Sequence, residues 1–441
     1  MMNIILLSGG SGKRLWPLSN ETMSKQFLRL LKNDKGEKES MVQRVFRQIK
    51  ETGINANIVI ATNTNQLDSI RSQLGDVDVV LEPERRNTYP AILLASAYLK
   101  YKKNVSMEDS ILVLPVDPFT ENTYFETLVK MDKAIQSNKS DMVLMGITPT
   151  YPSEKYGYIV CKESNEEVKE VDRFQEKPSL ERAKELLENG AYWNAGVFGF
   201  KLKYIDEILN KEIDNSSFED VFNNYSSINK NSFDYEVVEK ANSISMVPYS
   251  GYWKDLGTWN TLTEEMDSTH GLAVIGENSS NVSVVNVTDR PVVVLGLNNV
   301  VVTSSAEGVL VSDKEKSSYI KPYVENLDDR PMYQAKRWGE YKVIDDAKFS
   351  DGIKALTKHM TVLKGKSISL QLHHIRDEVW TIIDGEGEIM VDDKKWIVKR
   401  GDTICIEKEH KHKLTALTDL HFIETQIGEK LIEEDIERFD Y

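Results

Sequence analysis

The first half of the chain alternates short apolar runs with amphipathic stretches, and this alternation limits the fold more than any other feature. The amphipathic stretches 90–100 and 125–136 have the spacing of helices. The apolar runs are bounded by polar or glycine residues and cover 4–8, 58–62, 77–82, 111–117 and 142–146. Strands that alternate with helices in this way predict an α/β fold with a mostly parallel sheet covered on both faces. Ligands of such sheets bind at the carboxyl ends of the strands.

The second half has two β-rich textures. Short runs rich in Val, Ser, Asn and Gly occur at 282–287, 292–295, 300–303 and 309–311, and they predict a short β-helix-like segment. Beyond the polar stretch 325–336, runs at 368–373, 379–383, 388–391 and 403–406 alternate between Gly or Asp turns, which is typical of a small β-barrel. We therefore expect three domains, at 1–269, 270–328 and 329–441.

Charge and cysteine content narrow the classes of function. The chain has 55 basic and 70 acidic residues, a formal charge of −15, which argues against nucleic acid as a partner. Cys161 and Cys405 lie far apart and fit neither a metal nor a disulfide spacing, so they suit a reducing compartment. No apolar run approaches the ~20 residues that cross a bilayer. We expect a cytoplasmic protein without a membrane partner.

A glycine-rich turn follows the first predicted strand. It consists of Gly9, Gly10, Ser11 and Gly12. Glycines let backbone N–H groups approach a phosphate closely, although the spacing fits neither a P-loop nor a dinucleotide fingerprint. Such a turn is as often purely structural. Arg14 and Lys25 lie near it in a strongly acidic chain, and together they favour a clamp for a polyphosphate.

Two aspartates are candidate ligands for a hard cation. Asp117 ends the apolar run 111–116, and a carboxylate at the carboxyl end of a strand can hold a cation through oxygen. Asp255 is the second candidate. Taken singly, each aspartate is more often a helix cap or a turn residue.

The glycine turn is part of a longer string that is recognisable. Gly9-Gly10-Ser11-Gly12-Lys13-Arg14-Leu15-Trp16-Pro17-Leu18-Ser19, with Lys25-Gln26-Phe27-Leu28, closely resembles the signature of bacterial mannose-1-phosphate guanylyltransferases. The resemblance continues through most of the chain. It implies a Rossmann-like sheet of the nucleotide-diphospho-sugar transferase type. It also implies transfer of a guanylyl group from GTP to mannose-1-phosphate, giving GDP-mannose and pyrophosphate, with Arg14 and Lys25 neutralising the phosphate charge.

The resemblance also assigns nucleotide and metal residues. It places Glu82, Asn87 and Ala91 around the base and pairs Asp117 with Asp255 as the ligands of Mg²⁺. The sequence departs from the family at Pro118, where a histidine is usual after the metal aspartate. This departure puts the surroundings of the metal in question.

Sugar-binding residues are implied by further motifs. In Phe174-Gln175-Glu176-Lys177-Pro178 a β period would put the acid and the lysine on opposite faces, with Glu176 on sugar hydroxyls and Lys177 towards the sugar phosphate. The amide of Asn194 can bridge hydroxyls, and Gly157 would let backbone approach the sugar. Ala195 and Phe233 replace the usual Ser and Ile, so another manno-configured sugar, such as a heptose phosphate, is also compatible.

Histidines concentrate in the last predicted domain. Six of the seven lie there: His359, His373, His374, His410, His412 and His421. Strand alternation puts Gln371 and His373 on one face, and Glu378 and His412 can join them in a site for Zn²⁺ or another divalent metal. The segment resembles the cupin domain of type II phosphomannose isomerases. Because Ile375 and Val379 stand where histidines are usual, two alternatives remain: an isomerase, or a barrel that only stabilises or dimerises the protein.

A different class of function is a catalytically silent subunit that senses a GDP-sugar. The presence of Arg14, Lys25, Asp117 and Asp255 argues against it, since a sensor need not keep metal and leaving-group residues. A homodimer through the β-rich regions is a further hypothesis.

Overall fold

The computed structural model describes residues 1–10, 12–20, 23–327, 330–432 and 435–439. The chain forms two compact units. The first comprises Met1–Leu15, Ser24–Leu67 and Gln73–Asp267, and the second Trp16–Met23, Asp68–Ser72 and Ser268–Tyr441. The predicted boundary at 328 and 329 lies outside the described residues, so the division into three domains stays a prediction.

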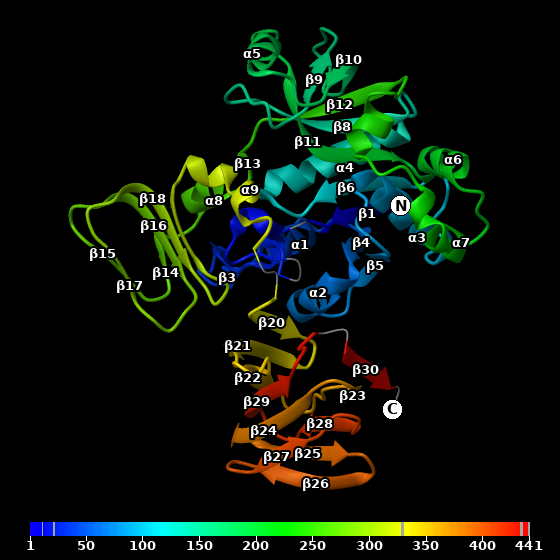
Figure 1. Ribbon diagram of the computed structural model, residues 1–441. Coiled ribbons are helices and arrows are strands. Elements are labelled where there is room, and N and C mark those ends of the chain that lie inside the picture. Colours follow the sequence, from blue (N-terminus) through cyan, green and yellow to red (C-terminus); the bar gives the residue numbers. More distant parts are fainter. Residues whose placement is uncertain (11, 21–22, 328–329, 433–434, 440–441) are drawn as a thin grey trace. The chain divides into compact units, whose positions relative to one another are not determined.

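A nine-stranded sheet organises the first unit (Figure 1). Its strands are β1 (Met2–Leu7), β4 (Ala56–Asn63), β5 (Asp78–Glu82), β6 (Ser110–Pro115), β8 (Met142–Ile147), β9 (Tyr158–Cys161), β10 (Lys169–Gln175), β11 (Tyr192–Lys201) and β12 (Ile244–Tyr249). They lie in the order β5-β4-β1-β6-β11-β8-β12-β10-β9. Each of the five predicted runs overlaps a strand of this sheet.

Most strands of this sheet run in the same direction. β5, β4, β1 and β6 are parallel to one another, as β8 is to β12. β11 runs antiparallel between β6 and β8, and β10 is antiparallel to both β9 and β12. Seven strands therefore run in one direction and β10 and β11 in the other, so the expectation of a mostly parallel sheet is confirmed. The two reversed strands were not predicted, because apolar runs carry no information about strand direction.

Helices flank this sheet. They are α1 (Met41–Glu51), α2 (Leu67–Leu74), α3 (Thr88–Tyr101), α4 (Asn122–Gln136), α5 (Leu180–Glu188), α6 (Leu202–Glu212), α7 (Phe218–Asn223) and α8 (Trp259–Glu265). Short elements complete the unit: η1 (Gly12–Leu15), η2 (Lys25–Phe27), η3 (Thr64–Gln66), η4 (Tyr225–Ser227), η5 (Asp234–Val238), β2 (Leu31–Lys32), β3 (Lys38–Glu39), β7 (Pro118–Thr120) and β13 (Trp253–Asp255).

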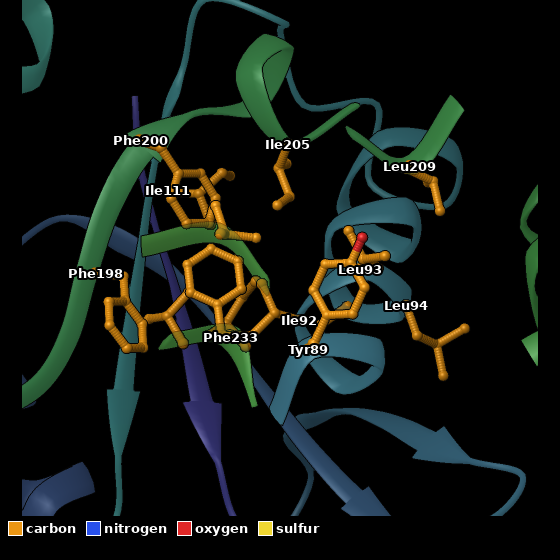
Figure 2. Packing of buried hydrophobic residues seen from close by; sticks show 14 of the residues in the cluster. Tyr89, Ile92, Leu93, Leu94, Ile111, Phe198, Phe200, Ile205, Leu209 and Phe233 are labelled. Atoms are coloured by element: carbon orange, nitrogen blue, oxygen red, sulfur yellow. The ribbon is translucent and has the colours of Figure 1, made fainter. Parts of the chain in front are cut away.

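An aromatic cluster beside α3 packs next to the segments that carry the polar residues Asn194 and Asp234 (Figure 2). Phe233 is fully buried, and its ring centroid lies 4.9 Å from that of Phe198 and 5.8 Å from that of Phe200. Large buried rings resist displacement because interiors are densely packed. Since Phe233 directly precedes Asp234, and Phe198 lies on the same strand as Asn194, the cluster anchors the segments that bear those two polar residues.

The middle of the second unit winds as a coil of short strands (Figure 1). They are β14 (Thr269–His270), β15 (Ala273–Ile275), β16 (Ser280–Asn286), β17 (Val292–Val294), β18 (Asn298–Ser304) and β19 (Val309–Asp313). β14, β16 and β18 pair in parallel in one sheet, with β19 antiparallel at its edge, and β15 pairs in parallel with β17. Valines between the two sheets form a small core. η6 (Lys316–Tyr319) and α9 (Lys321–Val324) follow.

The rest of the second unit is β-rich. Its strands are β20 (Tyr333–Lys336), β21 (Gly339–Lys348), β22 (Lys354–Val362), β23 (Leu370–His373), β24 (Asp377–Asp384), β25 (Glu386–Val391), β26 (Lys394–Lys399), β27 (Thr403–Ile406), β28 (His412–Ala416), β29 (Leu420–Gly428) and β30 (Ile436–Phe439). One sheet has the order β20-β21-β22-β29-β24-β27 and the other β26-β25-β28-β23-β30. Buried side chains from both sheets, including Trp380 and Phe422, form one core.

Candidate active site and metal centre

Polar side chains hold the glycine turn that follows β1. The hydroxyl of Ser24 donates to the carbonyl of Gly10 at 3.0 Å, and the amide of Gln66 donates to the same carbonyl at 3.2 Å. The amide of Gln26 donates to the carbonyl of Ser8. These bonds restrain the turn before any ligand binds. Ser11 lies outside the described residues, and Gly12 begins the short helix that carries the exposed Arg14.

The two candidate metal ligands, 138 positions apart in the chain, meet because two short strands pair. β13 runs antiparallel to β7 with Asp255 opposite Pro118, so Asp255 comes beside Asp117. Proline suits this position because it begins its strand. The Nζ atom of Lys25 lies 2.5 Å from Oδ2 of Asp117 and 3.9 Å from Oδ1 of Asp255. The structure therefore brings these three side chains together, and the charge of Arg14 also acts on both acids.

The two acids differ in their electrostatics. Desolvation raises the pKa of Asp255 although the charge of Lys25 opposes the shift. Desolvation acts in the same direction on Asp117, but the closer ion pair with Lys25 outweighs it and lowers the pKa of that carboxyl. Oδ1 of Asp255 is buried and has no hydrogen-bond partner among the described residues. A carboxylate oxygen without a hydrogen-bond partner in such a place is well suited to a hard cation.

A cavity of about 210 Å³ opens beside the two acids. It is lined by Pro115, Asp117, Pro118, Lys155, Tyr156, Gly157, Glu176, Asn194, Ala195, Gly196, Asp234, Trp253 and Asp255. Oε2 of Glu176 is buried there without a hydrogen-bond partner in the described part of the chain. A Cβ atom on Gly157 would lie 2.5 Å from that oxygen, so glycine is required for the acid to reach this position. The structure thus joins the three predicted sugar residues and the two predicted metal acids in one cavity.

The expected placement of Glu176 and Lys177 on opposite faces is wrong. β10 ends at Gln175, so the β period does not extend to the next two residues, and Lys177 has a left-handed backbone with φ of 40°. Its amine pairs with Oε1 of Glu176 instead of pointing to the opposite face. The pairing leaves Oε2 of Glu176 for the cavity.

Asn194 and Asp234 form a fixed pair at the cavity wall. Nδ2 of Asn194 donates to Oδ1 of Asp234 at 2.7 Å, while Oδ1 of Asn194 accepts from the backbone of Gly196 at 3.0 Å. Desolvation and the charge of Glu176 raise the pKa of Asp234 to about 6. Sequence reasoning left Asp234 out of the site, although the motif Ser232-Phe233-Asp234-Tyr235 was its signal. Lys155, Tyr156 and Trp253 were also missed. Tyr156 and Trp253 stand in the motifs that contain Gly157 and Asp255, whereas no motif marked Lys155.

Of the three predicted base residues, one lies directly against the glycine turn. Glu82 is buried, and its Oε2 accepts from the hydroxyl of Tyr225 at 2.8 Å. Its Oε1 would lie 2.8 Å from a Cβ atom on Gly9, so any side chain there would displace the acid. Desolvation raises the pKa of Glu82. Asn87 caps α3 through the backbone N–H of Thr88, and Ala91 is buried within that helix; their contact with a base stays a prediction.

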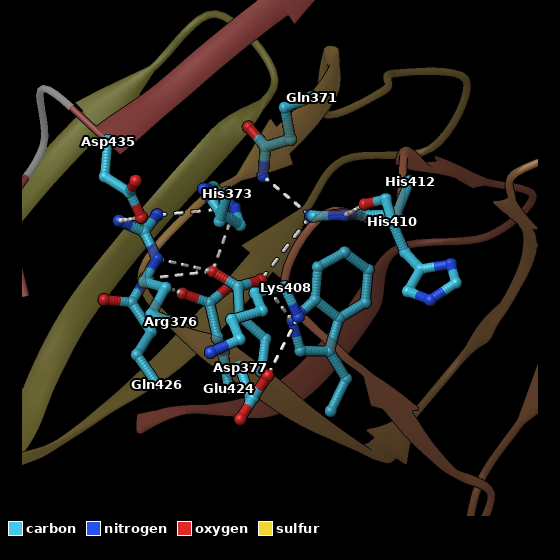
Figure 3. A network of polar contacts seen from close by, with 12 residues as sticks. Gln371, His373, Arg376, Asp377, Lys408, His410, His412, Glu424, Gln426 and Asp435 are labelled. Carbon is cyan, nitrogen blue, oxygen red and sulfur yellow. Dashed lines mark hydrogen bonds and ion pairs between the residues drawn. The ribbon is translucent and has the colours of Figure 1, made fainter. Parts of the chain in front are cut away.

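The predicted ligands of the second metal converge inside the C-terminal β-rich region (Figure 3). Nε2 of His373 lies 3.1 Å from Oε1 of Glu378, and Nε2 of His412 lies 3.6 Å from Oε2 of the same carboxylate. Nε2 of Gln371 is 3.3 Å from Nε2 of His412. The other ring nitrogen of His412 faces the carbonyl of His410, which leaves Nε2 directed at the cluster. One carboxylate and two imidazoles within 4.8 Å of one another fit a divalent cation.

This carboxylate is already well supplied with donors. Nε of Arg376 lies 3.1 Å from Oε1 of Glu378, and Trp380 donates to Oε2 at 3.1 Å. Burial alone would raise the pKa of Glu378, but the bond from His373 and the charges of His412 and Arg376 hold the pKa at about 2. Glu424, nearby in the same network, has a pKa raised to about 7 by burial and by Glu378.

A cation-flanked glycine turn and two facing carboxylates at the edge of an α/β sheet suit group transfer at a nucleoside triphosphate, which is the chemistry of nucleotidyltransferases. The comparisons agree with this class. The profile of the nucleotidyl transferase family matches residues 3–270, and that of the mannose-6-phosphate isomerase C-terminal domain matches residues 325–441. The chain belongs to the nucleotidyl transferase family, and it is an enzyme.

Full-length relatives have the same arrangement of two matched regions. The chain is 31% identical to the alginate biosynthesis protein AlgA of Pseudomonas putida over 100% of this chain and 96% of that protein. It is 32% identical to the xanthan biosynthesis protein XanB of Xanthomonas campestris over 99% and 97%. It is 29% identical to a mannose-1-phosphate guanylyltransferase of Klebsiella pneumoniae over 99% and 98%.

Among solved structures, one described as a mannose-1-phosphate geranyltransferase from Thermus thermophilus is similar with a TM-score of 0.61 and 28% identity. The match covers 74% of this chain and 99% of that one. Within the described residues no helix is long and apolar enough to cross a membrane.

Proposed function

We propose that the chain transfers the guanylyl group of GTP to mannose-1-phosphate, or to a related manno-configured sugar-1-phosphate, and releases pyrophosphate. The observation that carries the proposal is a single cavity with two unsatisfied acids: Oδ1 of Asp255 beside Asp117 and Lys25, and Oε2 of Glu176 at the other wall. The names of the relatives support this substrate pair and a place in the supply of polysaccharide precursors.

In the proposed reaction an oxygen of the sugar-1-phosphate attacks the α-phosphorus of GTP. The new P–O bond forms as the bond from that phosphorus to the bridging β-phosphate oxygen breaks, and the electron pair leaves with pyrophosphate. The attacking phosphate oxygen is already ionised, so no residue has to remove a proton. Lys25 and Arg14 would stabilise the charge that develops on pyrophosphate, and the wall with Glu176 would orient the sugar.

The transferase site fits Mg²⁺ because its free ligand atoms are carboxylate oxygens. Asp117 and Asp255 would hold the ion, and it would supply charge neutralisation between the triphosphate and the acids. Lys25 pairs with Asp117 in the structure, so ion binding and the position of this lysine are coupled.

The remaining roles follow the same proposal. The glycine turn receives the phosphates, and Glu82, Asn87 and Ala91 face the base. Gly157, Glu176 and Asn194 bind the sugar, and Asp234 joins them because its carboxyl orients the amide of Asn194. Lys177, which pairs with Glu176, would bind the sugar phosphate.

A substrate matrix tests the proposal. Purified protein is incubated with each of the four nucleoside triphosphates and a panel of hexose- and heptose-1-phosphates, with and without Mg²⁺, and pyrophosphate release is measured. We expect release with GTP and a manno-configured sugar, and its loss in Asp117→Ala. Absence of release with every pair, together with tight binding of GDP-mannose, would establish the silent sensor instead.

For the second unit we propose a short β-helix followed by a cupin barrel that binds a divalent cation, such as Zn²⁺, through Gln371, His373, Glu378 and His412. These four side chains are at most 8% exposed. We therefore expect the ion to stabilise the barrel rather than to contact a substrate. Zinc added after chelation should raise the unfolding temperature of the wild type but not of His412→Ala, with His421→Ala as the control. Conversion of mannose-6-phosphate to fructose-6-phosphate by the loaded protein would establish a working isomerase.

A further inference from the structure

Acidic side chains dominate the cavity that joins the proposed metal and sugar residues. Its carboxylates belong to Asp117, Glu176, Asp234 and Asp255. Among the described residues that line it, Lys155 is the only one with a basic side chain. A sugar-1-phosphate carries a charge of about −2 near neutral pH, and the acids oppose its entry. A cation in the lining therefore bears directly on whether such a molecule binds.

Two other lysines of the site already have carboxylate partners. The amine of Lys25 lies 2.5 Å from Oδ2 of Asp117, and the amine of Lys177 pairs with Glu176. The side-chain amine of Lys155, in contrast, forms neither an ion pair nor a hydrogen bond within the described part of the chain. It can therefore bind an arriving anion without first releasing a carboxylate.

The turn that presents Lys155 is anchored on both sides. Before it, the hydroxyl of the buried Tyr158 accepts from the backbone N–H of Ser153 at 2.9 Å and donates to its carbonyl at 3.1 Å. The hydroxyl of Ser153 in turn accepts from the backbone N–H of Lys155 at 3.1 Å. After it, the ring of Tyr156 packs against Trp193 with centroids 4.9 Å apart. The backbone of this turn is thus held before a ligand binds, which reduces the entropy lost on binding.

Lys155 also lies near the proposed metal ligands. Desolvation raises the pKa of Asp255, and the charges of Lys25 and Lys155 are among those that oppose this rise. In the proposed reaction the attacking phosphate oxygen has to come close to the metal acids, because the α-phosphate of GTP is neutralised there. A cation that lines the cavity and acts on Asp255 is therefore placed for the phosphate of the acceptor.

We propose that Lys155 binds the phosphate group of the sugar-1-phosphate, as a second cation beside Lys177, and so sets the affinity of the site for its acceptor. This role rests on the proposed function, because it takes the cavity to be the place where the acceptor binds. The ammonium group donates to phosphate oxygens and neutralises part of their charge, and it transfers no proton. Because Lys177 has to leave Glu176 before it can contribute, the arriving phosphate contacts Lys155 first.

Isothermal titration calorimetry tests this role without requiring turnover. Mannose-1-phosphate and a manno-heptose-1-phosphate are titrated into the full chain with Mg²⁺, with and without α,β-methylene-GTP, whose carbon bridge blocks transfer. For Lys155→Met we expect the dissociation constant of the sugar phosphate to rise about 10- to 100-fold, and that of the GTP analogue to stay unchanged. Lys155→Arg keeps the charge and should bind within about threefold of the wild type. The matched control is Lys162→Met, which removes an exposed pair with Glu170 and should bind as the wild type does.

Steady-state kinetics separate phosphate binding from an effect on the metal. KM for the sugar phosphate should rise by the same factor in Lys155→Met, while KM for GTP and the Mg²⁺ concentration that gives half the maximal rate stay within about twofold. Circular dichroism melting checks that each variant is folded. A changed Mg²⁺ requirement with unaltered affinity for the sugar phosphate would overturn the proposal.

Three other results would also overturn it: wild-type affinity in Lys155→Met, an equal loss in Lys162→Met, or a wild type that binds neither sugar phosphate. Failure of the proposed function is a separate outcome. A wild type that binds a sugar phosphate but releases no pyrophosphate would refute the transfer reaction, and the calorimetric comparison would still decide whether Lys155 holds the phosphate.

Discussion

The two acid-containing sites of this protein differ in how far their polar atoms are satisfied. Around Asp117 and Asp255 a half-buried lysine supplies the paired charge, and two carboxylate oxygens in the same cavity have no hydrogen-bond partner among the described residues. Around Glu378 the partners are an arginine, a tryptophan, a glutamine and two histidines, all buried. A buried carboxylate oxygen without a hydrogen-bond partner favours the binding of a ligand, whereas a carboxylate whose oxygens all have partners stabilises the surrounding structure. The comparison predicts that equivalent substitutions will have opposite consequences in the two places.

The largest effect should follow removal of the lysine charge from the site around Asp117 and Asp255. Lys25→Met takes away the charge that faces both acids, and we expect pyrophosphate release to fall by about 10³- to 10⁴-fold, or about 4 to 5.5 kcal/mol of transition-state stabilisation. The unfolding temperature should change little, because the partners of Lys25 remain partly exposed. Lys32→Met, which removes an exposed pair with Asp267, is the control. Comparable activity of both variants would remove Lys25 from the chemistry.

Removal of the arginine charge from the site around Glu378 should lower the stability of the fold instead. Arg376→Met leaves Glu378 and Asp435 buried without their guanidinium partner, and we expect a loss of about 3 to 4 kcal/mol of unfolding free energy. Urea unfolding of the second unit measures it, while the transferase rate should stay within about twofold. Arg400→Met breaks only an exposed pair with Asp384 and should leave the unfolding curve unchanged. If Arg376→Met reduced transfer as much as Lys25→Met does, the contrast between the two sites would be false.

A smaller effect depends on pH. The pKa of Asp234 is about 6 when folded against an ordinary value of 3.8, so the folded state binds this proton more tightly. Ionisation of this carboxyl therefore lowers the free energy of unfolding. The loss is absent below about pH 4 and complete above about pH 6. Asp234→Asn should therefore be about 2 kcal/mol more stable than the wild type at pH 7.5, and the difference should vanish near pH 4. Denaturant titrations at several pH values measure it.

Asp220→Asn is the control for that measurement. The pKa of Asp220 is lowered by bonds from Ser216 and Ser217, so its ionisation favours the folded state. Replacing Asp220 should lower the free energy of unfolding at neutral pH, so the pH dependence has the opposite sign to that of Asp234→Asn. A difference for Asp234→Asn that does not vary with pH would contradict the assigned desolvation.

The smallest effect concerns the shape of the cavity. In Gly157→Ala the new methyl group would lie 2.5 Å from Oε2 of Glu176, so the carboxylate has to move. We expect KM for the sugar phosphate to rise about tenfold, or about 1.4 kcal/mol, with KM for GTP unchanged. Steady-state kinetics with each substrate varied in turn distinguish the two. Equal increases for both substrates would place Gly157 outside the sugar subsite.

Local sequence patterns predicted much of this arrangement but not its pairings. The strand that precedes the glycine turn and the strand that precedes Asp117 were found from apolar runs, because burial leaves that pattern in the sequence. That Asp255 lies next to Asp117 depends on the pairing of β13 with β7, across more than 130 residues, and no local pattern encodes it. The family resemblance supplied the pair.

Errors occurred where a strand ended or reversed. Lys177 was placed by a period that stops at Gln175, and the backbone angle that turns it back onto Glu176 is invisible in the sequence letters. The long strand β11 was not assigned a direction, and its antiparallel insertion made the sheet mixed. By contrast, the four predicted ligands inside the C-terminal region lie close together, and alternation within β23 had placed Gln371 and His373 on one side.

The left-handed backbone of Lys177 has a consequence for how the enzyme could handle its acceptor. A glycine would adopt this turn without the roughly 1 kcal/mol that a side chain costs there. The position nevertheless carries a lysine, whose side-chain amine pairs with the neighbouring carboxylate of Glu176. If the proposed sugar phosphate binds at this amine, it replaces the carboxylate of Glu176 as its partner, and only the side chain of Lys177 has to move.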